Sequence, residues 1–212
     1  AAIASLASSR KDAAGAARAR REAAERLGVN PEAPTLLVTG GSLGALHVNE
    51  SMTGAADALP EGAQVVHLTG RGKDEPVRAA VEAAGCSDRW HVIDYLTTME
   101  DALAVADLVV CRSGAGTVAE MEALGLPCIY VPLPIGNGEQ RLNAADHVAA
   151  GGAQLIDDKD FTADFVRSNV FPLLGSARLA DMAAASQSLG RAGAARALAD
   201  LALEQVKENG HE

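Results

Sequence analysis

Aromatic residues and the patterns of common metal and redox sites are scarce in this sequence. Phe, Trp and Tyr account for 3% of the 212 residues, whereas 48% are hydrophobic, so alanine carries much of the apolar content and we expect tightly packed helices. The three cysteines form no C-x-x-C pair, and the five histidines show no i, i+4 or H-x-E arrangement. We therefore expect no metal site and no cofactor.

Long hydrophobic runs and a positive charge balance are also lacking. No apolar run approaches the length of about 18 residues that a membrane-spanning helix requires. The formal net charge of −10 argues against a nucleic-acid partner. The chain shows no signal-peptide pattern and begins Ala-Ala-Ile-Ala, which we interpret as a cut in a longer protein. Free cysteines in predicted buried strands fit a reduced, cytoplasmic setting.

The stretch 106–132 predicts a complete strand–helix–strand unit. The apolar run Leu108–Cys111 is typical of a strand that is buried on both faces. Thr117–Glu120 has the spacing of a capping box and predicts the start of a helix, which Gly125 ends before a second apolar run at 128–131. We expect the two strands to be parallel, with a right-handed crossover.

Two glycine-rich turns follow predicted strands. One contains Ser113 and Gly114, and the other contains Gly40, Gly41, Ser42 and Gly44. A turn that leads from a strand into a helix leaves backbone N–H groups unpaired at the positive end of the helix dipole, where a phosphate fits. In the second turn the Ser42 hydroxyl would add a donor. The glycines of that turn could equally serve only to let the helix and strand pack closely.

Glu120 has two possible roles one turn into the predicted helix. It could cap the backbone N–H of Thr117, as the acid of a T-x-x-E pattern often does. It could instead accept hydrogen bonds from the cis-diol of a ribose, as acids near phosphate turns do in nucleotide sites. The spacing alone does not decide between the two roles.

Two common nucleotide fingerprints are absent. A G-x-G-x-x-G dinucleotide motif would need glycine at Ser42 and Ala45, and no acidic residue closes the next predicted strand, 64–68. The G-x-x-x-x-G-K-[ST] phosphate loop is also missing. Nicotinamide cofactors and ATP hydrolysis are therefore disfavoured.

The order of elements predicts an α/β fold, namely a doubly wound six-stranded parallel sheet of the Rossmann-like type. The expected strands are 35–39, 64–68, 90–93, 108–111, 128–131 and 153–156. The expected helices include 11–27, 45–59, 140–150 and a helical segment at 162–207 that is broken near Pro172 and Gly175. We divide the chain into an N-terminal helix and lead-in at 1–34, an α/β domain at 35–160 and C-terminal helices at 161–212. The R-A-R-R run at 18–21 is interpreted as a solvated helix face, and the loop 70–73 as solvated too. Both glycine turns and the turn at Tyr95 follow the carboxyl ends of strands, so they can converge on one crevice. Tyr95 and Met99 are interpreted as core residues, although they face this crevice.

Five motifs together carry a resemblance to a known family. They are V-T-G-G-S-L-G-A at 38–45, D-Y-L-T-T-M at 94–99, C-R-S-G-A-G-T-V-A-E at 111–120, G-L-P at 125–127 and E-Q-R-L-N-A at 139–144. Their order over about residues 35–160 resembles the C-terminal, donor-binding half of the GT-B glycosyltransferases of family 28. Among these, it is most similar to the bacterial N-acetylglucosaminyltransferases that form lipid II.

The resemblance implies roles for individual residues. Glu120 would hold the uridine ribose, Leu96 would offer backbone groups to the uracil, and Glu139 with Gln140 would reach the sugar hydroxyls. The diphosphate and sugar would face Ser42 and the turn formed by Ala115, Gly116 and Thr117. The family often has two glutamines at positions 139 and 140, so the acceptor-only carboxylate of Glu139 is a departure.

The resemblance also implies an activity and its partners. The whole enzyme would transfer N-acetylglucosamine from UDP-N-acetylglucosamine to undecaprenyl-diphospho-muramoyl-pentapeptide, with inversion at the anomeric carbon. An N-terminal domain outside this chain would bind that lipid-linked muramyl acceptor and contact the inner face of the membrane. We assign no catalytic residue to this fragment, which we expect to be inactive alone. The alternatives are another UDP-sugar enzyme, such as a second family-28 transferase or an epimerase, and a non-catalytic nucleotide-sugar binding module.

Overall fold

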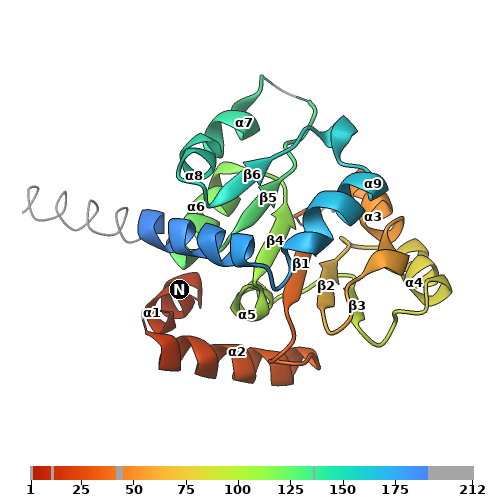
Figure 1. The fold of residues 1–212 in the computed structure, drawn as a ribbon, viewed down its shortest axis with the longest axis horizontal. Coiled ribbons are helices and arrows are strands. Elements are labelled where there is room, and N and C mark those ends of the chain that lie inside the picture. The colour runs from red at the N-terminus through yellow and green to blue at the C-terminus, as the bar shows by residue number, and fades with distance from the viewer. Residues whose placement is uncertain (1, 11, 42–44, 136, 191–212) are drawn as a thin grey trace, which may run out of the picture.

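The computed structural model describes residues 2–10, 12–41, 45–135 and 137–190, and the structural statements below refer to these residues. Six strands form one parallel sheet in the order β3-β2-β1-β4-β5-β6, which confirms the predicted doubly wound sheet (Figure 1). The strands are β1 Thr35–Thr39, β2 Gln64–Leu68, β3 Trp90–Ile93, β4 Leu108–Cys111, β5 Cys128–Tyr130 and β6 Ala153–Leu155.

The sheet reverses its direction of growth between β1 and β4. From β1 the chain adds β2 and β3 on one side, and then it returns to place β4, β5 and β6 on the other side. Leu37 of β1 is paired with Val66 of β2 and with Val109 of β4, so β1 and β4 are central neighbours. In an open parallel sheet a ligand binds at such a switch point, outside the carboxyl ends of the strands. The fold therefore directs attention to the residues that follow β1 and β4.

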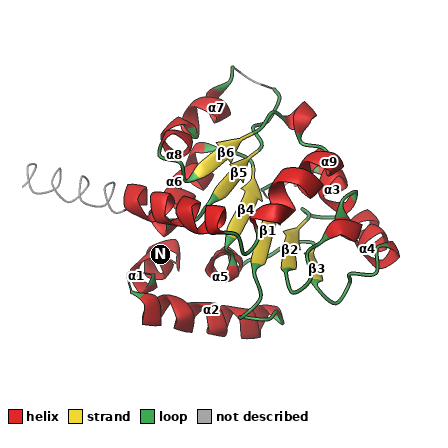
Figure 2. Cartoon of the chain, in the orientation of Figure 1, coloured by secondary structure: helices red, strands yellow, loops and turns green. Residues whose placement is uncertain are grey.

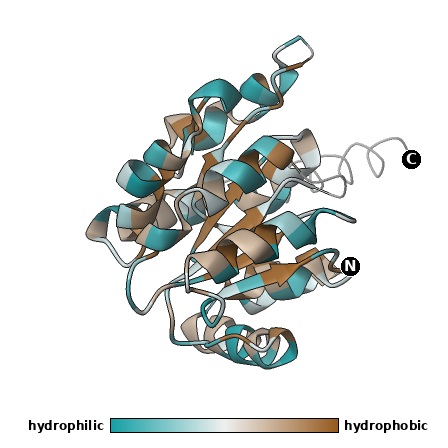
Figure 3. Cartoon of the chain, turned by 90° about the vertical axis from the view of Figure 1, so that its right-hand side faces the viewer, coloured by the Kyte–Doolittle hydropathy of each residue, from teal (hydrophilic) through white to brown (hydrophobic). Residues whose placement is uncertain are grey.

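Helices cover both faces of the sheet, which explains why the strands are apolar along their whole length (Figures 2 and 3). Alternate residues of β1 and β4 enter two separate core clusters, with Leu36 in one and Leu37 in the other. The first cluster packs beneath α3 Leu46–Thr53, α4 Asp74–Ala83, α9 Ala163–Phe165 and a helix at 177–190. The second packs beneath α1 Ala2–Ser9, α2 Ala13–Leu27, α5 Met99–Val105 and α6 Ala115–Leu124.

Several helix boundaries differ from the sequence prediction. Helix α1 was not predicted, and α3 ends at Thr53, followed by a short 3₁₀ turn at Ala56–Ala58. The single helix expected at 140–150 is two helices, α7 Glu139–Asn143 and α8 Ala145–Ala149, which are separated at the fully buried Ala144.

The C-terminal helical segment is broken near Pro172 and Gly175, as the sequence predicted. After α9 come a π-helical segment at Val166–Val170 and a 3₁₀ turn at Phe171–Leu173, and Gly175 then adopts a φ of 74° before the helix at 177–190. The 3₁₀ turn contains Pro172, which cannot donate the backbone hydrogen bond of a continuous helix. Residues 191–207 of that prediction lie outside the described residues.

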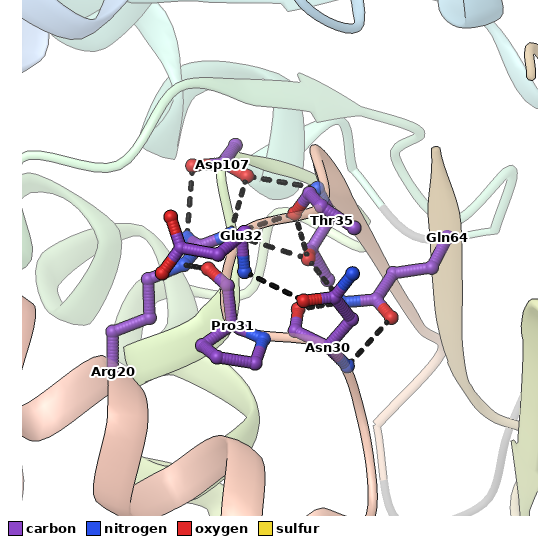
Figure 4. Close-up of polar contacts among 8 residues, drawn as sticks. Arg20, Asn30, Pro31, Glu32, Thr35, Gln64 and Asp107 are labelled. Carbon is purple, nitrogen blue, oxygen red and sulfur yellow. Dashed lines mark hydrogen bonds and ion pairs between the residues drawn. The ribbon is translucent and has the colours of Figure 1, made fainter. Parts of the chain in front are cut away.

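The R-A-R-R run is not a solvated face throughout, and this part of the interpretation is wrong (Figure 4). Arg20 donates two hydrogen bonds of 3.0 Å to the carboxylate of Asp107, and it also donates to the carbonyl oxygens of Pro31 and Ala33. Asp107 in turn accepts a hydrogen bond of 2.8 Å from the backbone N–H of Thr35. Arg20 therefore fastens α2 to the amino ends of β1 and β4.

Candidate functional site

A cavity of about 270 Å³ lies at the carboxyl ends of β1 to β4, at the switch point between β1 and β4. Thr39 and Gly41 line it after β1, Arg112 lines it after β4, and Thr117 and Glu120 line it from α6. The cavity therefore brings together the regions of both glycine turns. Ser42 and Gly44 lie outside the described residues, and Gly40 is half-buried beside the cavity-lining Gly41.

Helix α6 presents a free amino terminus at this site. Its N-cap is Gly114, which has no side chain to cap the helix, and Val118 donates the first intrahelical hydrogen bond, of 3.0 Å, to the Gly114 carbonyl oxygen. The N–H groups of Ala115, Gly116 and Thr117 thus precede that first bond, at the positive end of the helix dipole. This arrangement suits an anion such as a diphosphate.

The capping hypothesis for Glu120 fails on this geometry. The sequence predicted that Thr117 opens the helix, but α6 begins at Ala115, so Thr117 is its third residue. The capping box requires the acid to lie three positions after the N-cap, and that position is occupied by Thr117 itself. Glu120 lies one turn further along, half-buried, with its side chain lining the cavity. Glu120 therefore does not occupy the capping position, and it is one of the residues that line the cavity.

The space over three glycines bears on the packing alternative that was raised for the 40–45 turn. In that turn a methyl group added at Gly41 would meet no atom within 4 Å, and the same holds at Gly114 and Gly116 in the other turn. Gly41 also has a φ of 81°, a conformation that other residues rarely adopt. The space over these glycines is open to a ligand, so the packing alternative has no support at these three positions.

Arg112 brings a buried positive charge to the cavity wall. Its side chain is 15% exposed, and its Nη1 donates to the carbonyl oxygens of Val131 and Pro132 at 3.0 and 3.1 Å. The same nitrogen lies 2.5 Å from the Asp158 carboxylate. These contacts hold the guanidinium beside the start of α6, where it can attract an anionic ligand. The sequence analysis did not single out Arg112, although it lies inside the C-R-S-G-A-G motif.

The opposite side of the cavity is formed after β2 and β3, by Gly70 and residues 94–96. The Asp94 carboxylate accepts a hydrogen bond of 2.6 Å from the Gly72 N–H, and the Arg71 guanidinium stacks 3.7 Å from the centre of the Tyr95 ring. The interpretation of Tyr95 as a core residue is wrong, because it is 42% exposed and lines the cavity.

Met99 and the 70–73 loop also depart from their interpretations. Met99 is half-buried, and it both packs against the core and lines the cavity. The loop is not simply solvated, since Gly70 lines the cavity and Gly72 is bonded to Asp94. Leu96, which the resemblance assigns to the base, is half-buried at the same place.

Several described residues from the sequence analysis lie outside the lining of this cavity, namely Gly40, Ser113, Gly114, Ala115, Gly116, Glu139 and Gln140. Ser113 is fully buried, and its Oγ has no hydrogen-bond partner within the described structure. Glu139 is exposed at the start of α7, whereas the Gln140 side chain turns inward to the Ser113 backbone. Asn143, which was not singled out, also reaches Ser113. Its only sequence signal was its place in the E-Q-R-L-N-A motif.

Within the described part of the chain, no three His, Cys, Asp or Glu side chains are grouped so that they could hold a metal ion. None of the described helices has both the length and the apolar character needed to cross a membrane.

Comparison with known proteins places this site in a family. Residues 35–198 match the glycosyltransferase family 28 C-terminal domain, which covers the whole sheet and the cavity. The chain belongs to glycosyltransferase family 28. A crystal structure of MurG from Acinetobacter baumannii, another similar protein, superposes with a TM-score of 0.66 at 27% identity, and the match covers 78% of this chain and 48% of that one.

Two curated relatives of this family-28 chain carry the same name, UDP-N-acetylglucosamine–N-acetylmuramyl-(pentapeptide) pyrophosphoryl-undecaprenol N-acetylglucosamine transferase. The protein from Bifidobacterium adolescentis is 49% identical over 168 residues, which is 73% of this chain and 43% of the relative. The protein from Paenarthrobacter aurescens is 47% identical over 197 residues, which is 92% of this chain and 52% of the relative. The chain thus spans about half the length of the curated relatives it matches.

Proposed function

We propose that this chain is the donor-binding half of a family-28 transferase and that its cavity binds UDP-N-acetylglucosamine. The observation that carries the proposal is one cavity at the switch point with a free helix terminus on one side and the unpaired Glu120 carboxylate inside. A nucleoside diphosphate needs both kinds of group, since its phosphates take N–H donors and its ribose diol donates to a carboxylate.

Each part of the donor has a proposed place. The N–H groups of Ala115, Gly116 and Thr117 donate to the diphosphate, and the Arg112 guanidinium balances its charge from the side. Glu120 accepts from the ribose hydroxyls. The uracil lies against the backbone at Leu96, on the side of the cavity that Tyr95 and Gly70 also form.

The sugar lies beyond the diphosphate, toward Glu139 at the start of α7. Glu139 is exposed there, and its carboxylate accepts hydrogen bonds from sugar hydroxyls but cannot donate them.

The same groups would assist the reaction. In an inverting transfer an acceptor hydroxyl attacks the anomeric carbon while the bond between that carbon and the β-phosphate oxygen breaks. Negative charge therefore develops on the departing UDP. Fixed N–H donors and a buried guanidinium stabilise that charge more in the transition state than in the ground state. The donor half would thus activate the leaving group, and the proton of the acceptor hydroxyl would be removed by a group outside this chain.

The acceptor is proposed from the named relatives. Their shared name specifies a muramyl pentapeptide on an undecaprenyl diphosphate as the partner of UDP-N-acetylglucosamine. We infer the same acceptor for the whole protein, and hence a peripheral position on the inner face of the cell membrane, where such a lipid is reached. The membrane contact and the acceptor site would belong to parts of the protein beyond this chain.

Calorimetry with residues 1–212 in EDTA tests the donor site. We expect binding of UDP and UDP-N-acetylglucosamine without added metal, because backbone N–H groups and Arg112 supply the positive charge. ATP should bind much more weakly. A requirement for a divalent metal, or a preference for ATP, would overturn the proposal.

An activity assay separates the alternatives. We expect residues 1–212 alone to leave UDP-N-acetylglucosamine intact and to transfer nothing to a muramyl lipid, since positioning the acceptor and general-base help, worth about 10²–10⁴ in rate, are absent. Release of an epimerised sugar would favour an epimerase. Transfer by these residues alone would show that the catalytic groups lie in this half.

A further inference from the structure

We propose that Gln140 and Asn143 are positioning residues that hold the phosphate turn, residues 113–116, in its binding conformation. The inference rests on the proposed function, because it gives these two side chains a role in forming the diphosphate site. It also changes the role expected for Gln140, which the sequence resemblance assigned to the sugar hydroxyls.

The two side chains hold the backbone of one residue from both sides. Gln140 Oε1 accepts a hydrogen bond of 3.3 Å from the Ser113 N–H, and Asn143 Nδ2 donates one of 3.1 Å to the Ser113 carbonyl oxygen. The two residues are three positions apart on α7, so they lie on one side of the helix. Together they satisfy both backbone groups of the residue that links β4 to the phosphate turn.

The Gln140 oxygen also joins the turn to a second segment. It accepts a further hydrogen bond of 3.0 Å from the N–H of Leu133, in the loop after β5. Two N–H donors directed at one atom require an acceptor, which identifies that atom as the amide oxygen and not the nitrogen. The oxygen is therefore already occupied by the protein, and only the NH₂ group of Gln140 remains for a ligand.

Apart from the hydrogen bonds of α6 itself, the turn has little side-chain support within the described structure. A methyl group added at Gly114 or Gly116 would meet no atom within 4 Å, no side chain caps α6, and the buried Ser113 hydroxyl has no partner. The turn is thus open on its ligand side and held on its protein side by α7. The Arg141–Asp157 ion pair links α7 to the segment after β6, and this contact helps to keep α7 in place beside the turn.

The consequence for binding follows from preorganisation. A turn that is only partly populated in its binding conformation lowers the apparent affinity by that fraction. Two neutral hydrogen bonds would be lost with the Gln140 amide, and we expect roughly a tenfold loss of affinity when they cannot form.

Binding of UDP, which carries no sugar, separates the two roles of Gln140. We expect Gln140→Leu to bind UDP roughly tenfold more weakly than the unmodified chain, because the turn is no longer held. We expect Gln140→Glu, whose carboxylate still accepts from Ser113 and Leu133, to recover most of that affinity at high salt, where the added charge is screened. Leu142→Ala is the matched control on α7, since Leu142 is 74% exposed, and it should bind UDP normally.

Amide NMR spectra give a readout that does not depend on the ligand. In Gln140→Leu the Ser113 and Leu133 amide protons should shift upfield and exchange faster, whereas the Val118 amide, bonded to Gly114, should remain unchanged. In Gln140→Glu both signals should stay close to their original positions. If Gln140→Leu fails to fold, the glutamate variant alone decides, through its UDP affinity and these two amide signals.

Two results would overturn the inference. Normal UDP binding by Gln140→Leu with weaker binding of UDP-N-acetylglucosamine would return Gln140 to a direct sugar contact. Loss of UDP binding in the glutamate variant at high salt would show that the amide NH₂, and not the oxygen, is the important group. Failure of the unmodified chain to bind UDP would instead refute the proposed function, so the two failures are distinguishable.

Discussion

The two ends of the central strands β1 and β4 differ in how their polar groups are paired. At the amino ends, Arg20 and Asp107 satisfy each other and the surrounding backbone, and Gln64 bonds to Asn30 and to Thr35 (Figure 4). At the carboxyl ends, the Glu120 carboxylate forms no hydrogen bond within the described structure, the Ser113 hydroxyl has no partner, and α6 begins without a side-chain cap. The polar groups at the amino ends are paired within the protein, whereas several at the carboxyl ends have no partner within the described structure.

Because of this difference, we base the proposed binding site on unpaired polar groups and not on cavity size. The amino end has the larger cavity, of about 680 Å³, between α2 and the helix at 177–190. Its charged floor, Arg20 and Asp107, is already used by the protein. The cavity at the carboxyl end is about 270 Å³, and although Arg112 there is paired with Asp158, the Glu120 carboxylate has no hydrogen-bond partner within the described structure. Changes at paired groups should therefore alter stability, and changes at unpaired groups should alter binding.

The largest expected effect on stability concerns two buried histidines in paired networks. His67 lies between Trp90 and Asn49, and His147 lies between Tyr130 and Ser186. Burial lowers the pKa of His67 to about 3 and that of His147 to about 4. Both are therefore neutral in the folded protein, whereas they gain a proton near pH 6.5 when the chain unfolds.

The sign of the pH dependence follows from these values. Below pH 6.5 the unfolded chain binds more protons, so the stability that the neutral histidines contribute is complete above pH 6.5 and is lost as the pH falls toward 4. By pH 5 the two sites together should cost roughly 4 kcal/mol of unfolding free energy. Urea unfolding at pH 7, 6 and 5 measures this loss of unfolding free energy. In His147→Gln the change of unfolding free energy with pH should be about half as steep. An unchanged unfolding free energy over this range would contradict the assignment.

Arg20→Leu tests the paired amino end. It leaves the Asp107 carboxylate without its cation and two carbonyl oxygens without a donor, so we expect a loss of about 3 kcal/mol in unfolding free energy. UDP affinity should not change, because the pair lies at the other end of the strands. Arg21→Ala, at an exposed neighbouring position, should change stability by less than about 0.5 kcal/mol. Equal changes in unfolding free energy for the two substitutions would show that the Arg20 hydrogen bonds do not stabilise the fold.

Arg20 also shows where sequence reasoning ends. The six strands were predictable, because continuous apolar runs between turn residues are characteristic of strands buried on both faces, and their order placed the glycine turns at one edge. Arg20 looked solvated because its partner Asp107 is 87 positions away, and no local pattern records that contact. The contacts of Gln140 and Asn143 with Ser113 could not be predicted for the same reason, since these hydrogen bonds span 27 and 30 positions. Helix patterns were least informative where tertiary packing, as at the buried Ala144, interrupts a helix.

Glu120→Ala tests the unpaired carboxyl end. Removing the carboxylate should weaken UDP binding by about 1.5–3 kcal/mol, the scale of hydrogen bonds to a charged group, and should leave stability nearly unchanged. The mutant should also lose most of its preference for UDP over 2′-deoxy-UDP, because the ribose diol is the proposed donor. Glu50→Ala, which removes an exposed carboxylate from α3, is the control. Equal losses for the two nucleotides would mean that Glu120 does not contact the diol.

Gly116→Ala should have the smallest effect, but it separates stability from binding most clearly, because the unfolding free energy and the UDP affinity should change in opposite directions. Gly116→Ala adds a methyl group in the first turn of α6, where it meets no protein atom within 4 Å. Alanine is the better helix former, so unfolding free energy should rise by about 0.5–1 kcal/mol. The same methyl group would occupy the space proposed for the diphosphate, and UDP affinity should fall roughly three- to tenfold. Ala119→Gly, at an exposed position of the same helix, is the reciprocal control: it should lower stability by a similar amount and leave UDP affinity intact. If Gly116→Ala stabilises the chain and binds UDP normally, the diphosphate does not lie over this turn.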